Sequence, residues 1–139
     1  MRLVVTTPQA TVVDVDVVHV RAEDESGAFG VMRGHADLIT ALSISVLVHR
    51  GTDQREHFVA VRGGLLTVSG GTLVQALTRE AVVSNDLASL EGEVLARFRR
   101  SETEDERARA GARRLEGVLL ERVADYVRIE RRSVEKRIL

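Results

Sequence analysis

Four histidines and one glycine-rich stretch are the features of this sequence that could do chemistry. Residues 27–34 read GAFGVMRG and lack the GxxxxGK[ST] pattern of a phosphate-binding loop, so tight turns are the simpler interpretation. The histidines show neither HxxxH nor HExxH spacing, and without any cysteine a zinc site has too few ligands. No strand–elbow–helix pattern frames a nucleophilic serine. The sequence therefore predicts a chain that is not an enzyme by itself, with no cofactor and no metal site. The histidines are His19, His35, His49 and His57.

Clustered arginines are the other candidates for function. Cations stabilise the C-terminal ends of helices, and arginine also forms bidentate pairs with carboxylates on a partner protein, so both interpretations stay open. The chain carries 20 basic and 21 acidic residues, and this near-neutral charge argues against a general nucleic-acid binder. One cluster is Arg97, Arg99 and Arg100; the other is Arg128, Arg131, Arg132, Lys136 and Arg137.

The elements that must position these residues change type near residue 85. Before this point lie 17 of the 22 valines and eight of the nine threonines, which favour strands. After it, Glu and Arg make up 21 of 54 residues against 11 of 85 before it, which favours helices. The formal charge is −2 on the first part (seven basic, nine acidic) and +1 on the second (thirteen basic, twelve acidic). We predict an α+β chain with an N-terminal domain over residues 1–84 and a C-terminal helical domain over residues 85–139.

Short strands separated by turn residues indicate that residues 1–84 form an antiparallel β-sandwich. Gly70-Gly71 predicts a two-residue hairpin, because both positions tolerate positive φ, and residues 50–53 predict a second turn. Turn signals every eight to twelve residues are typical of a sandwich or barrel. The expected strands are residues 3–7, 12–20, 40–49, 57–61, 65–69 and 72–77.

Two apolar stripes predict helices after residue 85. Ser84, Asn85 or Asp86 could cap the first, and the capping-box spacings at Ser101 and Thr103 favour a turn there and hence a two-helix hairpin. The hairpin is the simplest interpretation, but the two stripes are also in phase by sevens, so the sequence permits an uninterrupted rod, roughly 70 Å long for residues 86–132. The stripes are Leu87, Leu90, Val94 and Phe98, then Ala108, Ala112, Leu115, Leu119 and Tyr126.

Residues 26–39, SGAFGVMRGHADLI, resemble the EGxxGVLPGHAPLL-like signature of the epsilon subunit of rotary F-type ATP synthases. Thr7-Pro8 and residues 61–68, VRGGLLTV, are similar to the family's early TP pair and SGGxxxV strand. The order of a β-rich part and then helices extends the resemblance over the whole chain. Arg33 and Asp37 stand where the family has proline, and with residues 114–116 (RLE) they resemble the alternate branch found in N-ATPase operons.

The resemblance implies a ten-stranded sandwich in the central stalk of a bacterial enzyme. It implies a non-catalytic subunit that binds gamma and the c-ring and lies peripherally at the cytoplasmic face of the inner membrane, without inserting. Its helices would inhibit ATP hydrolysis when extended toward the alpha and beta subunits. Ser89 stands where the family's ATP-binding [IL]DxxRA segment has arginine, so no cofactor is expected. The implied c-ring-facing residues are Ala28, Phe29, Gly30, Met32, Arg33, Gly34 and His35; the implied regulatory arginines are Arg97, Arg99, Arg100, Arg113, Arg114, Arg122 and Arg128.

An alternative from another class also fits the residues. A free-standing β-sandwich could bind a ligand and use the helical tail for dimerisation. Co-purification with a partner of gamma-subunit size would favour the first interpretation, and a stable homodimer would favour the second.

Overall fold

The structure is a computed structural model that describes the backbone of residues 1–138 and the side chains of residues 1–128 and 131. The chain forms two compact units, Met1–Arg100 and Ser101–Leu139. Because these units are separate bodies, each is considered by itself below.

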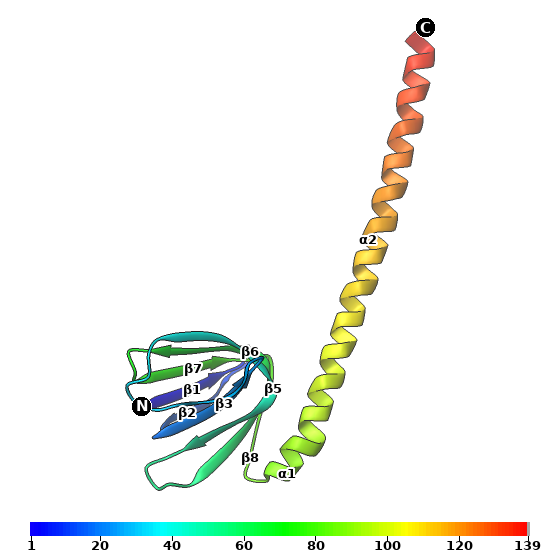
Figure 1. The fold of residues 1–139 in the computed structure, drawn as a ribbon. Coiled ribbons are helices and arrows are strands. Elements are labelled where there is room, and N and C mark those ends of the chain that lie inside the picture. Colours follow the sequence, from blue (N-terminus) through cyan, green and yellow to red (C-terminus); the bar gives the residue numbers. More distant parts are fainter. Residues whose placement is uncertain (139) are drawn as a thin grey trace. The chain divides into compact units, whose positions relative to one another are not determined.

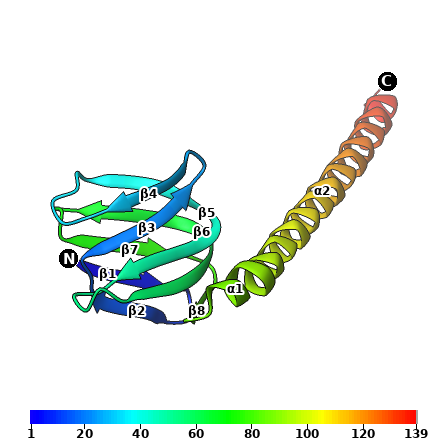
Figure 2. The same ribbon diagram turned by 60° about the horizontal axis from the view of Figure 1, so that its bottom comes forward.

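Eight strands among the described residues form one continuous sheet that curls into two layers (Figure 1 and Figure 2). The strand order is β2-β1-β7-β6-β5-β3-β4, and β8 pairs with β6 away from this path. All pairings are antiparallel except β1 with β7, so the predicted antiparallel sandwich is confirmed with one parallel pair. The strands are β1 (Arg2–Thr6), β2 (Thr11–Asp16), β3 (His19–Asp24), β4 (Gly27–Val31), β5 (Leu38–Arg50), β6 (Glu56–Ser69), β7 (Leu73–Leu77) and β8 (Ala81–Ser84).

The long strands β5 and β6 join the two layers. Residues 58–61 of β6 pair with β8, whereas residues 65–69 pair with β7. The strand bends between these halves at Gly63 and Gly64, whose φ angles of 66° and 109° favour glycine; a Cβ on Gly64 would also collide with the Leu77 carbonyl. The described residues thus form eight strands, not the ten that the resemblance implied. The two numbers agree if each of the long strands β5 and β6 is counted as two strands, one in each layer.

Several predicted strand boundaries were wrong for identifiable reasons. The strand expected over residues 12–20 breaks at Val17 and Val18, whose amides bond to Met1 and Arg50 carbonyls outside any ladder. The strands expected over residues 57–61 and 65–69 are one strand, because the glycines between them bend β6 without ending it. Both predicted turns are present, since Gly70-Gly71 joins β6 to β7 and the turn after residue 50 joins β5 to β6. The first was wrong in length: Ser69 pairs with Leu73, so the loop has three residues, Gly70, Gly71 and Thr72.

Inward-facing valine and leucine side chains fill the sandwich. Each fully buried side chain of this size contributes roughly 1.5–3 kcal/mol of transfer free energy, so the core does not depend on aromatic rings. The largest fully buried side chains of this core are Leu3, Leu47, Leu66, Val5, Val20, Val31, Val59, Val61, Val68 and Val74.

The chain after β8 begins with a short helical segment, residues 86–100, which we call the helix foot. Asp86 caps it by accepting a hydrogen bond from the Ser89 amide at 3.3 Å. One turn, η1 (Leu90–Val94), has π-helical i→i+5 bonding between α1 (Leu87–Ser89) and α2 (Leu95–Ile138). The foot belongs to the same compact unit as the sandwich.

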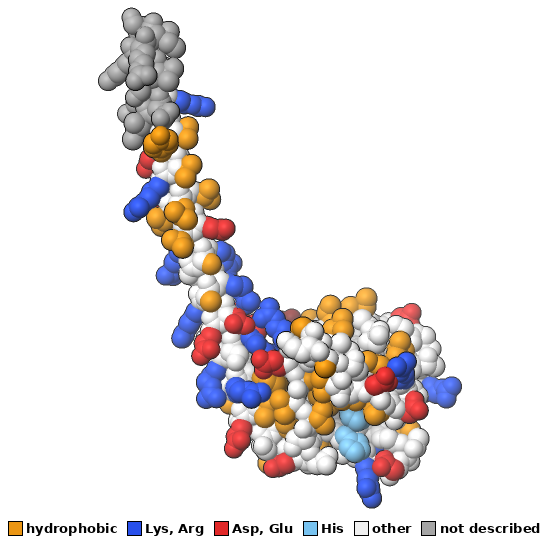
Figure 3. All heavy atoms as spheres, turned by 180° about the vertical axis from the view of Figure 1, so that it is seen from behind, with side chains coloured by type: hydrophobic (Ala, Val, Ile, Leu, Met, Phe, Trp, Pro, Cys, Tyr) orange, Lys and Arg blue, Asp and Glu red, His pale blue; other side chains and the backbone are white. Residues whose placement is uncertain are grey.

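The two-helix hairpin is wrong for this structure, which has the continuous alternative. Ser101 and Thr103 lie inside α2, which runs to Ile138. Residues 95–110 contain neither glycine nor proline, so the capping side chains have no backbone break to cap. We call residues 101–138 the arm. Figure 3 shows basic, acidic and apolar side chains interspersed along it. The part of the hairpin prediction that falls on Leu139 lies outside the described residues.

Candidate interaction surfaces

The glycine-rich stretch singled out in the sequence forms the edge strand β4 and the turn after it. Ala28, Met32 and Arg33 are exposed, with Met32 at 60%, whereas Phe29 is half-buried against the core. His35 is also half-buried, and its ring Nδ1 lies 2.6 Å from the Ala36 carbonyl oxygen. The turn therefore presents a flexible apolar side chain and a cation to its surroundings while Phe29 anchors the strand.

A second glycine turn holds this stretch in place. Gly34, at φ 87°, donates its amide to the Gly71 carbonyl at 2.9 Å, and a Cβ on Gly71 would lie 2.7 Å from the Gly34 Cα. The Asp37 carboxylate accepts a hydrogen bond from the Gly70 amide at 2.8 Å. The Gly70-Gly71 hairpin is thus both a chain reversal and a support for the 32–37 turn.

Sequence reasoning missed the role of His19 beside this stretch. Its imidazole packs on Gly30, where an added Cβ would lie 2.9 Å from the Nε2 atom. His19, Gly30, Met32 and His35 line a shallow hollow at the surface. Only the pairing of β3 with β4 brings His19 here, so no local pattern could have shown it.

An exposed apolar face on β5, β6 and β7 was also missed. Leu65 pairs with both Ala41 and Leu77, and Ile39 lies two residues before Ala41 on the same side of β5. Ile39 is 74% exposed, Leu65 46% and Leu77 55%. The adjacent apolar pairs Leu38-Ile39 and Leu65-Leu66 were the available signal, because consecutive apolar residues place one on each face of a strand. An apolar sheet face of this kind is a candidate surface for another protein.

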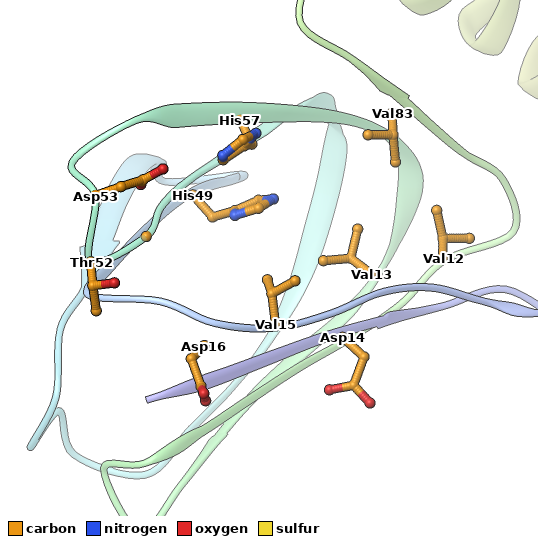
Figure 4. A pocket seen from close by; sticks show the side chains of 11 residues that line it. Val12, Val13, Asp14, Val15, Asp16, His49, Thr52, Asp53, His57 and Val83 are labelled. Atoms are coloured by element: carbon orange, nitrogen blue, oxygen red, sulfur yellow. The ribbon is translucent and has the colours of Figure 1, made fainter.

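A groove of about 670 Å³ opens between β2 and the β5–β6 hairpin (Figure 4). Val13 and Val15 face the His49 and His57 rings across it, whereas Asp14 and Asp16 point to the other side of β2. The two imidazoles stack with ring centroids 5.3 Å apart. The groove thus offers apolar walls and two imidazoles, and Thr52 and Asp53 of the β5–β6 turn also line it.

Burial lowers the pKa of His49, and the neighbouring His57 lowers it further. His49 is 6% exposed, and its Nδ1 atom has no hydrogen-bond partner among the described residues. A neutral His49 imidazole is therefore the state that this environment favours. Among the described residues no three His, Asp or Glu side chains gather as a metal site would require.

The arginines expected to be regulatory divide into two groups. Arg97 lies in the foot, with its guanidinium 4.0 Å from Glu80 and 5.3 Å from the centre of the Phe98 ring. In the arm, Arg109 pairs with Glu102 at 3.6 Å and Arg128 with Asp125 at 3.7 Å, within the helix itself. Such exposed pairs contribute little to stability, so the arm's cations are available to a partner. The remaining expected positions, all exposed, are Arg99, Arg100, Arg113, Arg114 and Arg122.

Comparison with known proteins identifies the family of this sandwich-and-helix chain. The beta-sandwich domain of the ATP synthase delta/epsilon chain matches residues 1–84. ATP synthase epsilon chain 2 of Cereibacter sphaeroides is 44% identical over 110 residues, which are 78% of this chain and 73% of that protein. The chain belongs to the ATP synthase epsilon chain family. ATP synthase epsilon chain 2 of Paraburkholderia xenovorans is 36% identical over 132 residues, 94% of this chain and 95% of that protein.

Solved structures show the same fold as this epsilon chain. A chain of the Euglena gracilis mitochondrial ATP synthase, in a complex of OSCP, F1 and c-ring, aligns with a TM-score of 0.57 at 22% identity, over 64% of this chain and 57% of that one. A chain from the central stalk and c-ring of the Tetrahymena thermophila mitochondrial ATP synthase aligns with a TM-score of 0.54 at 16% identity, over 75% and 91%.

The family settles the class of the protein. The epsilon chain is a non-catalytic subunit of ATP synthase, as the sequence led us to expect. Membership in a multisubunit enzyme also weighs against the alternative of a free-standing ligand-binding module. No helix within the described residues is both long enough and apolar enough to span a membrane.

Proposed function

We propose that this epsilon chain couples rotation of the gamma subunit to the c-ring through two surfaces of its sandwich. The exposed apolar face of Ile39, Leu65 and Leu77 carries the proposal, because a sheet face of this kind in a stalk subunit needs a protein partner. We assign this face to gamma. The turn of β4, with Met32 and Arg33 exposed, is assigned to the c-ring on the strength of the family signature in residues 26–39.

The setting follows from the same relatives. Two of them are named ATP synthase epsilon chain 2, which supports the alternate operon branch for this chain. We therefore propose a bacterial enzyme in which the subunit lies peripherally at the cytoplasmic face of the inner membrane. No contact with nucleic acid is part of the proposal, since basic and acidic residues balance.

We assign the restraint of ATP hydrolysis to the arm. Its large apolar side chains between Leu115 and Val127 are exposed, with Leu115 at 61% and Tyr126 at 64%. A lone helix of this kind gains stability mainly from packing against something, so a partner is needed to hold it extended. Arg113, Arg114 and Arg122 are exposed beside these apolar residues and suit acidic surfaces of the alpha and beta subunits.

Charge on the apolar face tests the coupling role. We expect Leu77→Glu to abolish co-purification of the chain with gamma, because a carboxylate would lose its hydration in that interface. Val83→Glu is the matched control: Val83 is 51% exposed but lies on β8, outside the face. Equal retention of gamma by both variants would contradict the assignment.

Removal of the arm tests the regulatory role. Deleting residues 101–139 should raise the ATPase activity of the assembled complex while gamma stays bound, because the sandwich surfaces are retained. We place the cut after Arg100 and not after Ser84, since the earlier cut would remove the buried Leu90, Leu95 and Phe98. Unchanged ATPase activity would rule out inhibition and leave coupling as the function.

A further inference from the structure

We infer that the helix foot is a permanent part of the sandwich unit, that Glu80 helps to hold it there through Arg97, and that the regulatory arm begins at Ser101. The regulatory part of this inference rests on the proposed function of the arm. The docking of the foot does not, and it can be tested separately.

Apolar packing is the first support for a fixed foot. Phe98 is fully buried, Leu90 is 1% exposed and Leu95 6%, and they form a cluster with the buried Ala60 of β6. The π-helical turn explains how both leucines face the sheet. In an α-helix, residues five apart lie about 140° apart around the axis, whereas the i→i+5 bond from the Leu95 amide to the Leu90 carbonyl brings them onto one side.

A charged cluster at the edge of this packing is the second support. The Glu80 carboxylate lies 3.5 Å from the Arg62 guanidinium and, with its other oxygen, 4.0 Å from that of Arg97. Arg62 is deeply buried, with a side chain only 8% exposed, so the carboxylate beside it offsets the cost of burying a cation. Glu80 follows β7 and Arg62 lies in β6, so the contact links the foot to the sandwich.

The environment changes at Ser101. No side chain of the arm that the structure describes is buried, whereas three of the foot are. Two ion pairs of the arm, Arg109 with Glu102 and Arg128 with Asp125, join residues of the arm to each other. We therefore expect a conformational change of the C-terminal segment to begin after Arg100, beyond the docked residues.

This division gives the arginines different roles. Arg97 is an anchor that faces Glu80 and Phe98, so its loss would loosen the foot. Arg113, Arg114 and Arg128 lie in the arm, where they can meet a partner protein. Substitutions in the two groups should thus affect regulation by different routes.

Hydrogen–deuterium exchange of the full-length chain, alone and in the assembled complex, tests the inference. Amides of residues 95–98 should exchange as slowly as those of β6 in both samples, and amides beyond residue 104 should exchange much faster in the isolated chain. Glu80→Gln should speed exchange at residues 95–98 several-fold, because the buried Arg62 and the exposed Arg97 both lose their carboxylate. Glu102→Gln, which removes an ion pair within the arm, should leave those amides unchanged.

Two results would overturn the inference. One is fast exchange at residues 95–98 in either sample; the other is an equal response of those amides to Glu80→Gln and Glu102→Gln. Neither readout depends on ATPase activity. A failure of the arm to inhibit hydrolysis would therefore leave the docked foot standing, and a mobile foot would leave the inhibitory role standing.

Discussion

The helix foot and the arm are consecutive stretches of similar sequence in opposite environments. Both are rich in arginine and glutamate, and both carry an apolar residue every three or four positions. The foot is buried because β5, β6 and β8 offer it an apolar surface that includes Ile44, Phe58 and Val82. The described side chains of the arm have no such surface within their own unit. An amphipathic pattern thus predicts a helix, but the residues that cover it decide whether the helix is structural or available to a partner.

Truncating one large side chain in each stretch is the strongest test of this contrast. Phe98→Ala should lower the free energy of unfolding by about 3–5 kcal/mol, because it removes a fully buried ring and leaves a cavity. Leu119→Ala, at a position 53% exposed in the arm, should change it by less than about 0.5 kcal/mol. Urea unfolding followed by circular dichroism measures both. Similar losses in the two variants would show that the arm is as well packed as the foot.

The foot also shows where sequence patterns reach their limit. The seam near residue 85, the sandwich and the Gly70-Gly71 hairpin follow from strand and turn propensities, which act locally. The stripe that predicted the first helix includes Val94 and not Leu95, yet Val94 is half-buried and Leu95 is buried. An inserted π-turn shifts the phase by one residue, and only the surface of the sheet selects it. The sequence could not show that Glu80 and Arg62 lie near Arg97, because this contact depends on how β6 and β8 place the three residues.

The candidate surfaces divide in the same way. The glycine-rich stretch could be found because its residues are consecutive, and the family resemblance gave it a role that stays a prediction. The apolar face of Ile39, Leu65 and Leu77 could not be found so directly, since three strands contribute one residue each. Residues that are neighbours in the sequence can be recognised from a pattern. Residues that are neighbours across a sheet can be recognised only when the strand register is known.

The pH dependence of stability provides a second test of the contrast between the arm and the unit that contains the foot. All four histidines lie before Ser101 and none lies in the arm. Burial lowers the pKa of His49, so below pH about 6.5 the unfolded chain gains a proton that the folded chain does not. The free energy of unfolding should therefore fall with decreasing pH, by at most about 1.4 kcal/mol per pH unit, until the pH reaches the folded pKa. Unfolding curves at a series of pH values between 7.5 and 5 measure this slope.

Variants separate His49 from other sources of acid sensitivity. His49→Leu should flatten the slope, and His35→Gln, at the half-buried histidine of the 32–37 turn, should retain it. The pKa of Asp14 is held low by its hydrogen bond to Arg2, and that of Asp24 by Ser26 and Thr40, so the stabilisation from these carboxylates is lost only at lower pH. An unchanged slope in His49→Leu would show that another group titrates. The helix content of the arm should not follow this transition.

The smallest expected effect comes from two helical glycines, one in the foot and one in the arm. Gly92 lies in the π-turn of the foot and Gly117 in the arm, and a Cβ at either position would meet no atom within 4 Å. Replacing a helical glycine by alanine is worth about 0.5–1 kcal/mol of helix stability. Gly92→Ala should add about that much to the free energy of unfolding. Gly117→Ala should raise the far-ultraviolet helix signal and leave that free energy unchanged, because the arm is a separate unit. An equal gain from both would mean that the arm unfolds together with the sandwich and that the boundary at Ser101 is wrong.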